Sequence, residues 1–215
     1  SLAVMGGGIL AQNPVVITLH FFGLHELFWM ISLWGITILL ISSKLSIPAV
    51  DNIRPEKANY RYPIFIAIRN TNNWLTAIHV SLLNLSIFVL ADLWSNSYLT
   101  QEHAISQNFA AFTTSMIYLG YIVGSILFGF YSDRTQIRKP IMLAGVFIAI
   151  ASLILINNDV NISCLPILFL LLGIGCGAQV IGFSYVAISN PIIAAASATT
   201  ILSFVSVLCG AVFQQ

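Results

Sequence analysis

The stretch Gly129-Phe-Tyr-Ser-Asp133-Arg134-Thr-Gln-Ile-Arg138-Lys139 places one acid and three bases between two long uncharged runs, residues 109–132 and 140–157. A bilayer-spanning helix needs about 20 mostly apolar residues, and both runs come near that length. A short charged segment between two such runs is typical of a loop at the membrane surface. The stretch therefore predicts a polytopic membrane protein rather than a water-soluble domain.

The composition of the whole chain supports this interpretation. Of its 215 residues, 58% are hydrophobic and only 7% are charged, and the mean hydropathy is +0.93. Soluble domains carry roughly 25% charged residues, so a soluble fold of this size would lack polar surface. The net charge of +1 gives no reason to expect a nucleic-acid partner. The lipid bilayer is the expected surroundings of most of the chain.

Seven segments are long and apolar enough to be predicted as spanning helices. Their apolar runs are continuous rather than alternating, which favours helices over a transmembrane barrel. The expected fold class is therefore an all-α membrane protein, a polytopic helical bundle. The predicted spans are Leu2–Phe22, Leu27–Ser42, Trp74–Trp94, Phe109–Tyr131, Ile141–Asn157, Leu165–Ser189 and Ile192–Phe213.

The basic residues divide the connections into two classes. The turns 23–26, 95–108 and 158–164 contain no lysine or arginine. With helices that cross the membrane alternately, the two connections that do carry bases lie on one side, which the positive-inside rule makes cytoplasmic. All eight bases lie in those two connections: Lys44, Arg54, Lys57, Arg61 and Arg69 in the first, and Arg134, Arg138 and Lys139 in the second.

The longest connection, 43–73, is polar and contains three prolines. It predicts a cytoplasmic linker, with room for a short surface helix, between two groups of helices. The expected organisation is two spans in residues 1–42, the linker in 43–73, and five spans in 74–215.

In this context the charged stretch resembles the signature loop of the major facilitator superfamily. That loop has a glycine, three residues, an aspartate and a base, then one residue, a glycine, one residue and two bases. Gly129, Asp133, Arg134, Arg138 and Lys139 match it, whereas Gln136 stands where the family usually has its second glycine. The family carries this loop after its second helix and, in degraded form, after its eighth, and the missing glycine fits the degraded copy.

Other stretches extend the resemblance over nearly the whole chain. Residues 6–14 with 22–28 resemble the fifth-to-sixth helix passage, and residues 173–179 and 210–214 resemble the tenth and eleventh helices of bacterial members. The resemblance implies helices five to eleven of a twelve-helix transporter, so we expect a fragment of a longer protein. It also implies secondary transport of a small solute by alternating access, coupled to protons or another ion, in a bacterial inner membrane.

The resemblance implies a gating role for Gly129, Asp133, Arg134, Arg138 and Lys139. In the family this loop holds one conformation by charge pairing and releases it in the other. An acid at a helix end can pair with a guanidinium and with the amides of a neighbouring helix. The alternative is structural: Asp133 and Arg134 end a helix, and Arg138 and Lys139 fix the topology.

Polar residues inside spans normally face a cavity or another helix. At 100° per residue, Asn73, Ser81, Asn84 and Asp92 fall within about 100° of arc, and we predict that they line the substrate cavity. Asp92 lies near the outer end, where it could simply meet water. His79 lies on another face and fits either a proton relay or a hydrogen bond between helices.

Further cavity candidates lie on other spans. Gln179 is nearer the middle of the membrane than Tyr185 and is the better candidate for solute contact. Tyr118 and Tyr121 are additional candidates. Gln12 precedes Pro14, so its side chain could either line the cavity or satisfy the backbone carbonyl that proline leaves free.

Small residues and absent motifs complete the prediction. Gly120 with Gly124 and Gly173 with Gly177 have the four-residue spacing that allows close helix packing. No lysine or arginine lies within a span, so the solute is neutral, cationic or lipophilic, or its charge partner lies elsewhere. No nucleotide-binding loop, metal-site spacing or serine-hydrolase elbow occurs, so neither enzyme activity nor a cofactor or metal is expected. The competing hypothesis is a non-transporting truncated protein or helical scaffold.

Overall fold

The structure is a computed structural model, and it describes residues 25, 26, 28, 29, 32, 33, 35–41, 61–102, 105–158 and 161–213. The predicted span Leu2–Phe22 and the candidate Gln12 lie outside the described residues. The described residues within the predicted span Leu27–Ser42 are helical.

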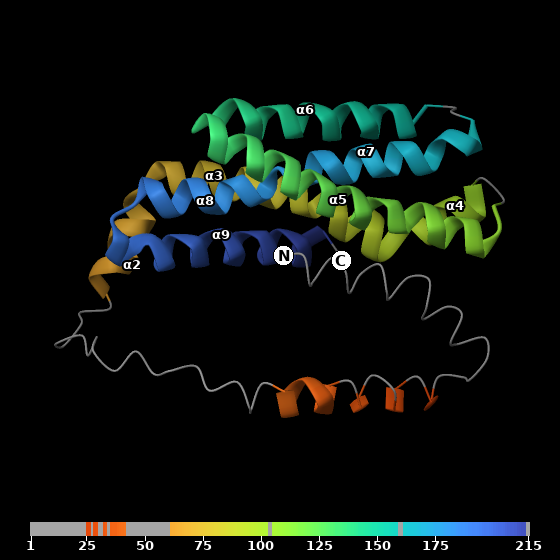
Figure 1. Cartoon of the computed structure of the whole chain (residues 1–215), viewed down its shortest axis with the longest axis horizontal. Coiled ribbons are helices and arrows are strands. Elements are labelled where there is room, and N and C mark those ends of the chain that lie inside the picture. Colours follow the sequence, from red (N-terminus) through yellow and green to blue (C-terminus); the bar gives the residue numbers. More distant parts are fainter. Residues whose placement is uncertain are drawn as a thin grey trace.

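All regular elements in the described part of the chain are helices, as the composition predicts (Figure 1). They are α2 Arg61–Arg69, α3 Thr71–Ser86, the π-helix η1 Ile87–Trp94, α4 Ser95–Glu102, α5 Gln107–Thr135, α6 Lys139–Ile156, the 3₁₀ turn η2 Ile162–Cys164, α7 Leu165–Gly177, α8 Gln179–Ser189 and α9 Ile192–Phe213.

Five helical segments among the described residues are long and apolar enough to cross a membrane, and they correspond to the third to seventh predicted spans. The last of them has the predicted bounds. The segments are Thr71–Gln101, Gln107–Thr135, Lys139–Ile156, Ile162–Ser189 and Ile192–Phe213.

Residues 95–102, predicted as part of a connection, are helical instead, because the helix of the third span continues through α4 to Glu102. Apolar runs report only the part of a helix that contacts lipid, whereas α4 is held by protein contacts. Leu99 is fully buried, and the Thr114 hydroxyl of α5 donates a hydrogen bond to Ser95 Oγ over 2.8 Å. A polar segment predicted as a connection therefore packs as a helix.

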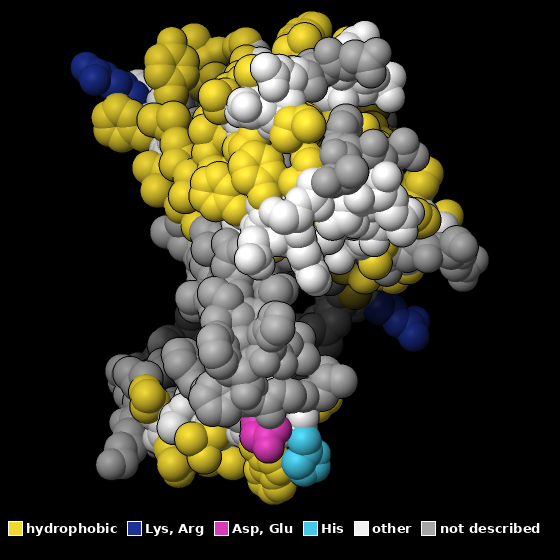
Figure 2. Space-filling model, turned by 90° about the vertical axis from the view of Figure 1, so that its right-hand side faces the viewer, with side chains coloured by type: hydrophobic (Ala, Val, Ile, Leu, Met, Phe, Trp, Pro, Cys, Tyr) yellow, Lys and Arg dark blue, Asp and Glu magenta, His cyan; other side chains and the backbone are white. Residues whose placement is uncertain are grey.

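The two ends of the bundle differ in charge. The α5–α6 connection, the α8–α9 connection and α2 lie at the left in Figure 1, whereas α4 and the α6–α7 connection lie at the right. Arg61, Arg69, Arg134, Arg138 and Lys139 all belong to the elements at the left, which we call the basic end. Figure 2, which views the molecule from the other end, shows hydrophobic side chains over much of the upper surface.

Helices α5 and α7 approach each other at the predicted glycine pairs. A Cβ added to Gly120 would lie 2.1 Å from the Leu170 carbonyl oxygen, and one added to Gly173 would lie 2.1 Å from the Ile117 carbonyl oxygen. Only glycine permits such backbone proximity. The main buried cluster, which includes Phe169 and Leu172 of α7, fills the space around this contact.

Helix α2 lies within the predicted linker and packs on the bundle at its basic end. Its Ala67 is fully buried and belongs to a second core cluster with Val80 of α3, Val186 of α8 and Leu202 of α9. The division of the chain at residues 43–73 remains a prediction.

Candidate functional site

The candidate site in the middle of the bundle is built around Gln179 and Tyr121. Gln179 is the first residue of α8, directly after the break at Ala178, and Tyr121 is the central residue of α5. The Gln179 Nε2 amide donates a hydrogen bond of 2.9 Å to the Tyr121 hydroxyl oxygen. Both side chains are buried, with 5% and 3% of their surface exposed.

The amide of Gln179 is only half satisfied, because its Oε1 atom is buried and has no hydrogen-bond partner. In this orientation Nε2 faces Tyr121, and Oε1 remains an unpaired acceptor. An unsatisfied buried polar atom costs about 1–3 kcal/mol. The Oε1 atom can therefore accept a further hydrogen bond.

Local contacts interrupt the helix between α7 and α8. The predicted continuous helix 165–189 is interrupted at Ala178, where the amides of Ala178 and Ile181 donate to carbonyls three residues earlier, over 3.2 and 3.1 Å. Gly177 lies against the backbone of α5, since an added Cβ would lie 2.5 Å from Ser125 N. This close contact and the tightened turn fix Gln179 against α5.

The side chains of the predicted cavity stripe on α3 and η1 do not converge on one site. Ser81 donates back to the Ala77 carbonyl over 2.6 Å. Asn84 donates to Ser206 Oγ of α9 over 2.7 Å. Both contacts join residues within the bundle, and a cavity role for this stripe remains a prediction.

Asn73 belongs to a buried amide cluster at the basic end. Its Nδ2 donates to the Ala67 carbonyl over 2.9 Å and to Asn190 Oδ1 over 3.1 Å, and Asn190 Nδ2 donates back to Asn73 Oδ1 over 2.7 Å. Asn70 Nδ2 also donates to Asn190 Oδ1, over 3.1 Å. The cluster joins α2 and α3 to the α8–α9 connection, so Asn73 has a structural role in this conformation.

Asp92 pairs with a second predicted residue, because it accepts a hydrogen bond from the hydroxyl of Tyr118 on α5. Asp92 lies within the π-helix η1 and is exposed. A π-helix has more residues per turn than an α-helix, so Asp92 does not follow the 100° spacing used for the predicted stripe. It therefore points toward α5, whereas Asn84 contacts α9. π-Helical turns are frequent at functional sites.

The predicted gating loop lies at the basic end and is largely exposed. The side chains of Asp133, Arg134 and Lys139 are exposed, and Arg138 is partly buried with its Nε lacking a hydrogen-bond partner. Nothing lies within 4 Å of a Cβ added to Gly129, so no close contact requires glycine there. The charged groups of the loop are accessible to other segments.

Gln136 is the one described non-glycine residue with positive φ, at 57°. It ends α5 in the left-handed conformation, with its amide donating to the Ser132 carbonyl over 2.9 Å. Glycine is the usual residue at such a position. The glycine of the family signature thus corresponds to a position with left-handed backbone, which Gln136 adopts here. The Gln136 side-chain Nε2 donates a hydrogen bond to the Asp133 carbonyl over 2.7 Å.

Sequence reasoning missed Asn190 and Ser206, the partners of Asn73 and Asn84. Asn190 lies in the two-residue gap between the predicted spans Leu165–Ser189 and Ile192–Phe213, and α8 and α9 are separated at the same place. Ser206 lies in a run of small residues with no distinguishing pattern.

Tyr185 lies near Lys139, whose Nζ is 5.8 Å from the tyrosine ring centre. Among the described residues, no group of three or more His, Cys, Asp or Glu side chains could hold a metal.

A family model described as an uncharacterised MFS-type transporter, YbfB, matches residues 97–211. The match spans more than half of the 215 residues and includes α5, the predicted gating loop, the Gln179–Tyr121 pair and most of α9. No curated protein matches the chain, and no solved structure matches it.

Proposed function

The chain belongs to the major facilitator superfamily and is a multi-pass membrane protein of the transporter class rather than an enzyme. From this family membership we propose that the Gln179–Tyr121 pair forms part of a solute site. The proposed activity is secondary transport of a small solute by alternating access, coupled to protons or another ion. In such transporters two halves rock about a site near the middle of the membrane.

The observation that carries this proposal is the unpaired Gln179 Oε1 beside Tyr121, in the interior of the bundle. A buried amide oxygen without a donor is destabilising unless something supplies one. A solute hydroxyl, amide or ammonium group can do so. Because the pair is uncharged, we propose a neutral or cationic solute that offers a hydrogen-bond donor at this depth.

We propose that the loop around Asp133 and Arg134 gates the cytoplasmic side, in a bacterial inner membrane. Two features support this role: the exposure of both charged side chains at the basic end, and the resemblance of the loop to the family signature. Exposed charges can pair with segments that approach in one conformation and separate in the other.

A binding screen tests the solute site. The purified chain is heated in detergent with a panel of neutral, cationic and anionic solutes, and the unfolding temperature is compared with that of the double variant Gln179→Met/Tyr121→Phe. Because this variant removes both hydrogen-bonding partners together, we expect it to fold with similar stability. Gln101→Met, which changes an exposed glutamine at the end of α4, is the matched control.

We expect neutral or cationic donors to stabilise the wild type and Gln101→Met but not the double variant. A solute that stabilises all three proteins equally would remove the Gln179–Tyr121 pair as its site. Hits are then tested for uptake by cells that express the full-length protein.

A further inference from the structure

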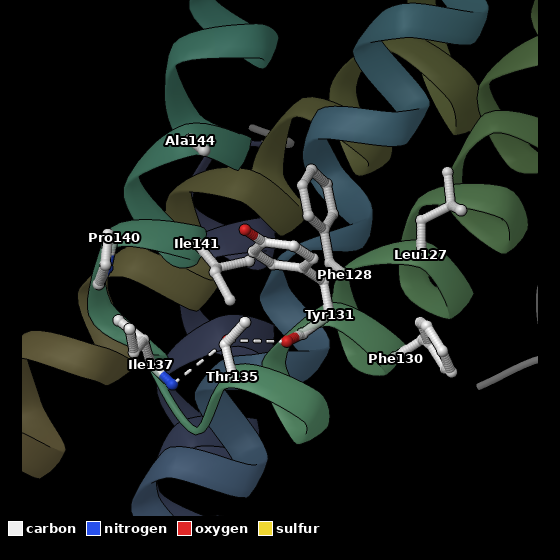
Figure 3. A pocket seen from close by; sticks show the side chains of 9 residues that line it. All are labelled: Leu127, Phe128, Phe130, Tyr131, Thr135, Ile137, Pro140, Ile141 and Ala144. Atoms are coloured by element: carbon white, nitrogen blue, oxygen red, sulfur yellow. Dashed lines mark hydrogen bonds between the residues drawn. The ribbon is translucent and has the colours of Figure 1, made fainter.

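An apolar groove of about 550 Å³ lies at the basic end, between the last turns of α5 and the first turns of α6. Phe128 and Tyr131 of α5 form one side, and Pro140, Ile141 and Ala144 of α6 form the other (Figure 3). Phe130 and Leu127 also line the groove, and their side chains are 67% and 57% exposed. The groove thus opens on a surface whose large side chains are apolar.

A second hollow, of about 380 Å³, adjoins the groove and shares Ile137 and Pro140 with it. Its lining differs, because it includes the two bases Arg138 and Lys139 as well as the ring of Tyr185. The Nε atom of Arg138 is buried and lacks a hydrogen-bond partner. An apolar groove and a cationic hollow therefore adjoin at one end of the bundle.

The charge in this region is positive. The connection and its flanks hold Arg134, Arg138 and Lys139 against the single acid Asp133. A guanidinium with an unpaired N–H is suited to a phosphate, to which arginine binds through two parallel hydrogen bonds. Free phosphate would leave the adjoining apolar groove empty, whereas a phospholipid has a phosphate for the cationic hollow and acyl chains for the groove.

We propose that this groove and hollow form a binding site for an anionic glycerophospholipid. The phosphate binds Arg138 and Lys139 at the membrane surface, and one acyl chain lies along Phe128, Ile141 and Ala144. Basic pockets between helices on the cytoplasmic side are suited to anionic headgroups. Charge complementarity at the mouth favours this ligand over a zwitterionic lipid, and the apolar lining below it favours a lipid over free phosphate.

The test measures binding of phosphatidylglycerol to the full chain in detergent, by the rise in unfolding temperature over a titration, with phosphatidylcholine and inorganic phosphate as comparison ligands. Two variants address the two parts of the site. Arg138→Gln/Lys139→Gln removes the charges, and Ala144→Phe fills the groove from an exposed position on α6. Ala144→Leu is a smaller replacement, in case the phenyl ring lowers stability.

Each variant has a matched control. Arg61→Gln/Arg69→Gln removes two exposed bases from α2 at the same end, and Ala151→Phe adds a phenyl ring to another exposed position of α6 outside the groove. We expect the charge variant to weaken phosphatidylglycerol binding about 25-fold, since each of the two bases near an anionic lipid contributes roughly a fivefold factor. The groove variants weaken it about tenfold or more, because they displace the acyl chain, and both controls stay within about twofold of the wild type.

Equal stabilisation by phosphatidylcholine would overturn the proposal, and so would the full effect with inorganic phosphate alone. Loss of binding in the charge variant but not in the groove variants would reduce the effect to surface electrostatics and would also contradict the site.

Discussion

Replacement of Gly120 by alanine is expected to destabilise the bundle, because α5 and α7 touch at this residue. The added Cβ would lie 2.1 Å from the Leu170 carbonyl oxygen and 3.0 Å from the Ile174 amide nitrogen, whereas ordinary contact begins at 3.4 Å. Both neighbours are backbone atoms of a helix, so no side-chain rotation relieves the overlap. The two helices must move apart by about 1 Å.

The expected loss of stability follows from this movement. Overpacking in a well-packed interior costs about 1–3 kcal/mol, and a gap of 0.5–1 Å loses a quarter to a half of the dispersion attraction across it. Alanine regains up to about 1 kcal/mol over glycine in a helix. Because the gap extends to the contacts at Gly124, Gly173 and Gly177, we expect a net loss of about 2–3 kcal/mol.

Gly129→Ala is the matched control, since the residue lies on the same helix and has nothing within 4 Å of an added Cβ. This variant should be neutral or gain up to about 1 kcal/mol. Thermal unfolding of both variants in the same detergent compares them directly. For a chain of this size, the expected difference is roughly 5–10 °C. Equal unfolding temperatures would refute the interpretation that the glycines hold α5 against α7.

Three further substitutions test other parts of the structure. Asn73→Leu should lower the free energy of unfolding by about 2–4 kcal/mol, because it leaves the buried Asn190 amide and the Ala67 carbonyl without partners. Asn72→Leu, on the exposed side of α3, should change it by less than about 0.5 kcal/mol, and similar losses in both variants would contradict the role of the amide cluster. Gln136→Gly should be at least as stable as the wild type and Gln136→Val less stable by about 1–2 kcal/mol, because φ is 57° at this residue, and the reverse order would refute the left-handed end of α5. Asp133→Asn should slow transport by the full-length protein while Asp133→Glu retains most of it; an unchanged rate in Asp133→Asn, with unchanged accessibility from both sides, would leave only a structural role for this carboxylate.

The spans could be predicted because lipid excludes charge, which leaves long uncharged runs in the sequence. Helix α9 has its predicted bounds, and the gap before it holds Asn190-Pro191, a dipeptide that is typical of turns. Helix α4 could not be predicted in the same way, because it is polar and is held by contacts such as the one between Thr114 and Ser95. Hydropathy carries no information about such contacts.

The candidate site was only partly visible in the sequence. Gln179 and Tyr121 were each predicted as cavity residues, but their pairing depends on the approach of α7 and α8 to α5 across 58 positions of sequence. The assumption of a constant α-helical angle failed at Asp92, because η1 is a π-helix and nothing in its apolar residues indicates this. Long-range packing, rather than local propensity, decides both features.

The most direct test of the central claim is the accessibility of single cysteines to a membrane-impermeant thiol reagent. Gln179→Cys and Asn84→Cys are made in the full-length protein after the native cysteines Cys164, Cys176 and Cys209 have been replaced. Leu172→Cys, at a fully buried position in the α7 core, is the control that should never react.

The reagent is applied from one side of the membrane at a time, with and without a stabilising solute and with an imposed ion gradient. Alternating access around the Gln179–Tyr121 site predicts that both test cysteines react from one side in one condition and from the other side in another, and that bound solute slows the reaction. Protection of both cysteines from both sides under every condition would contradict the account.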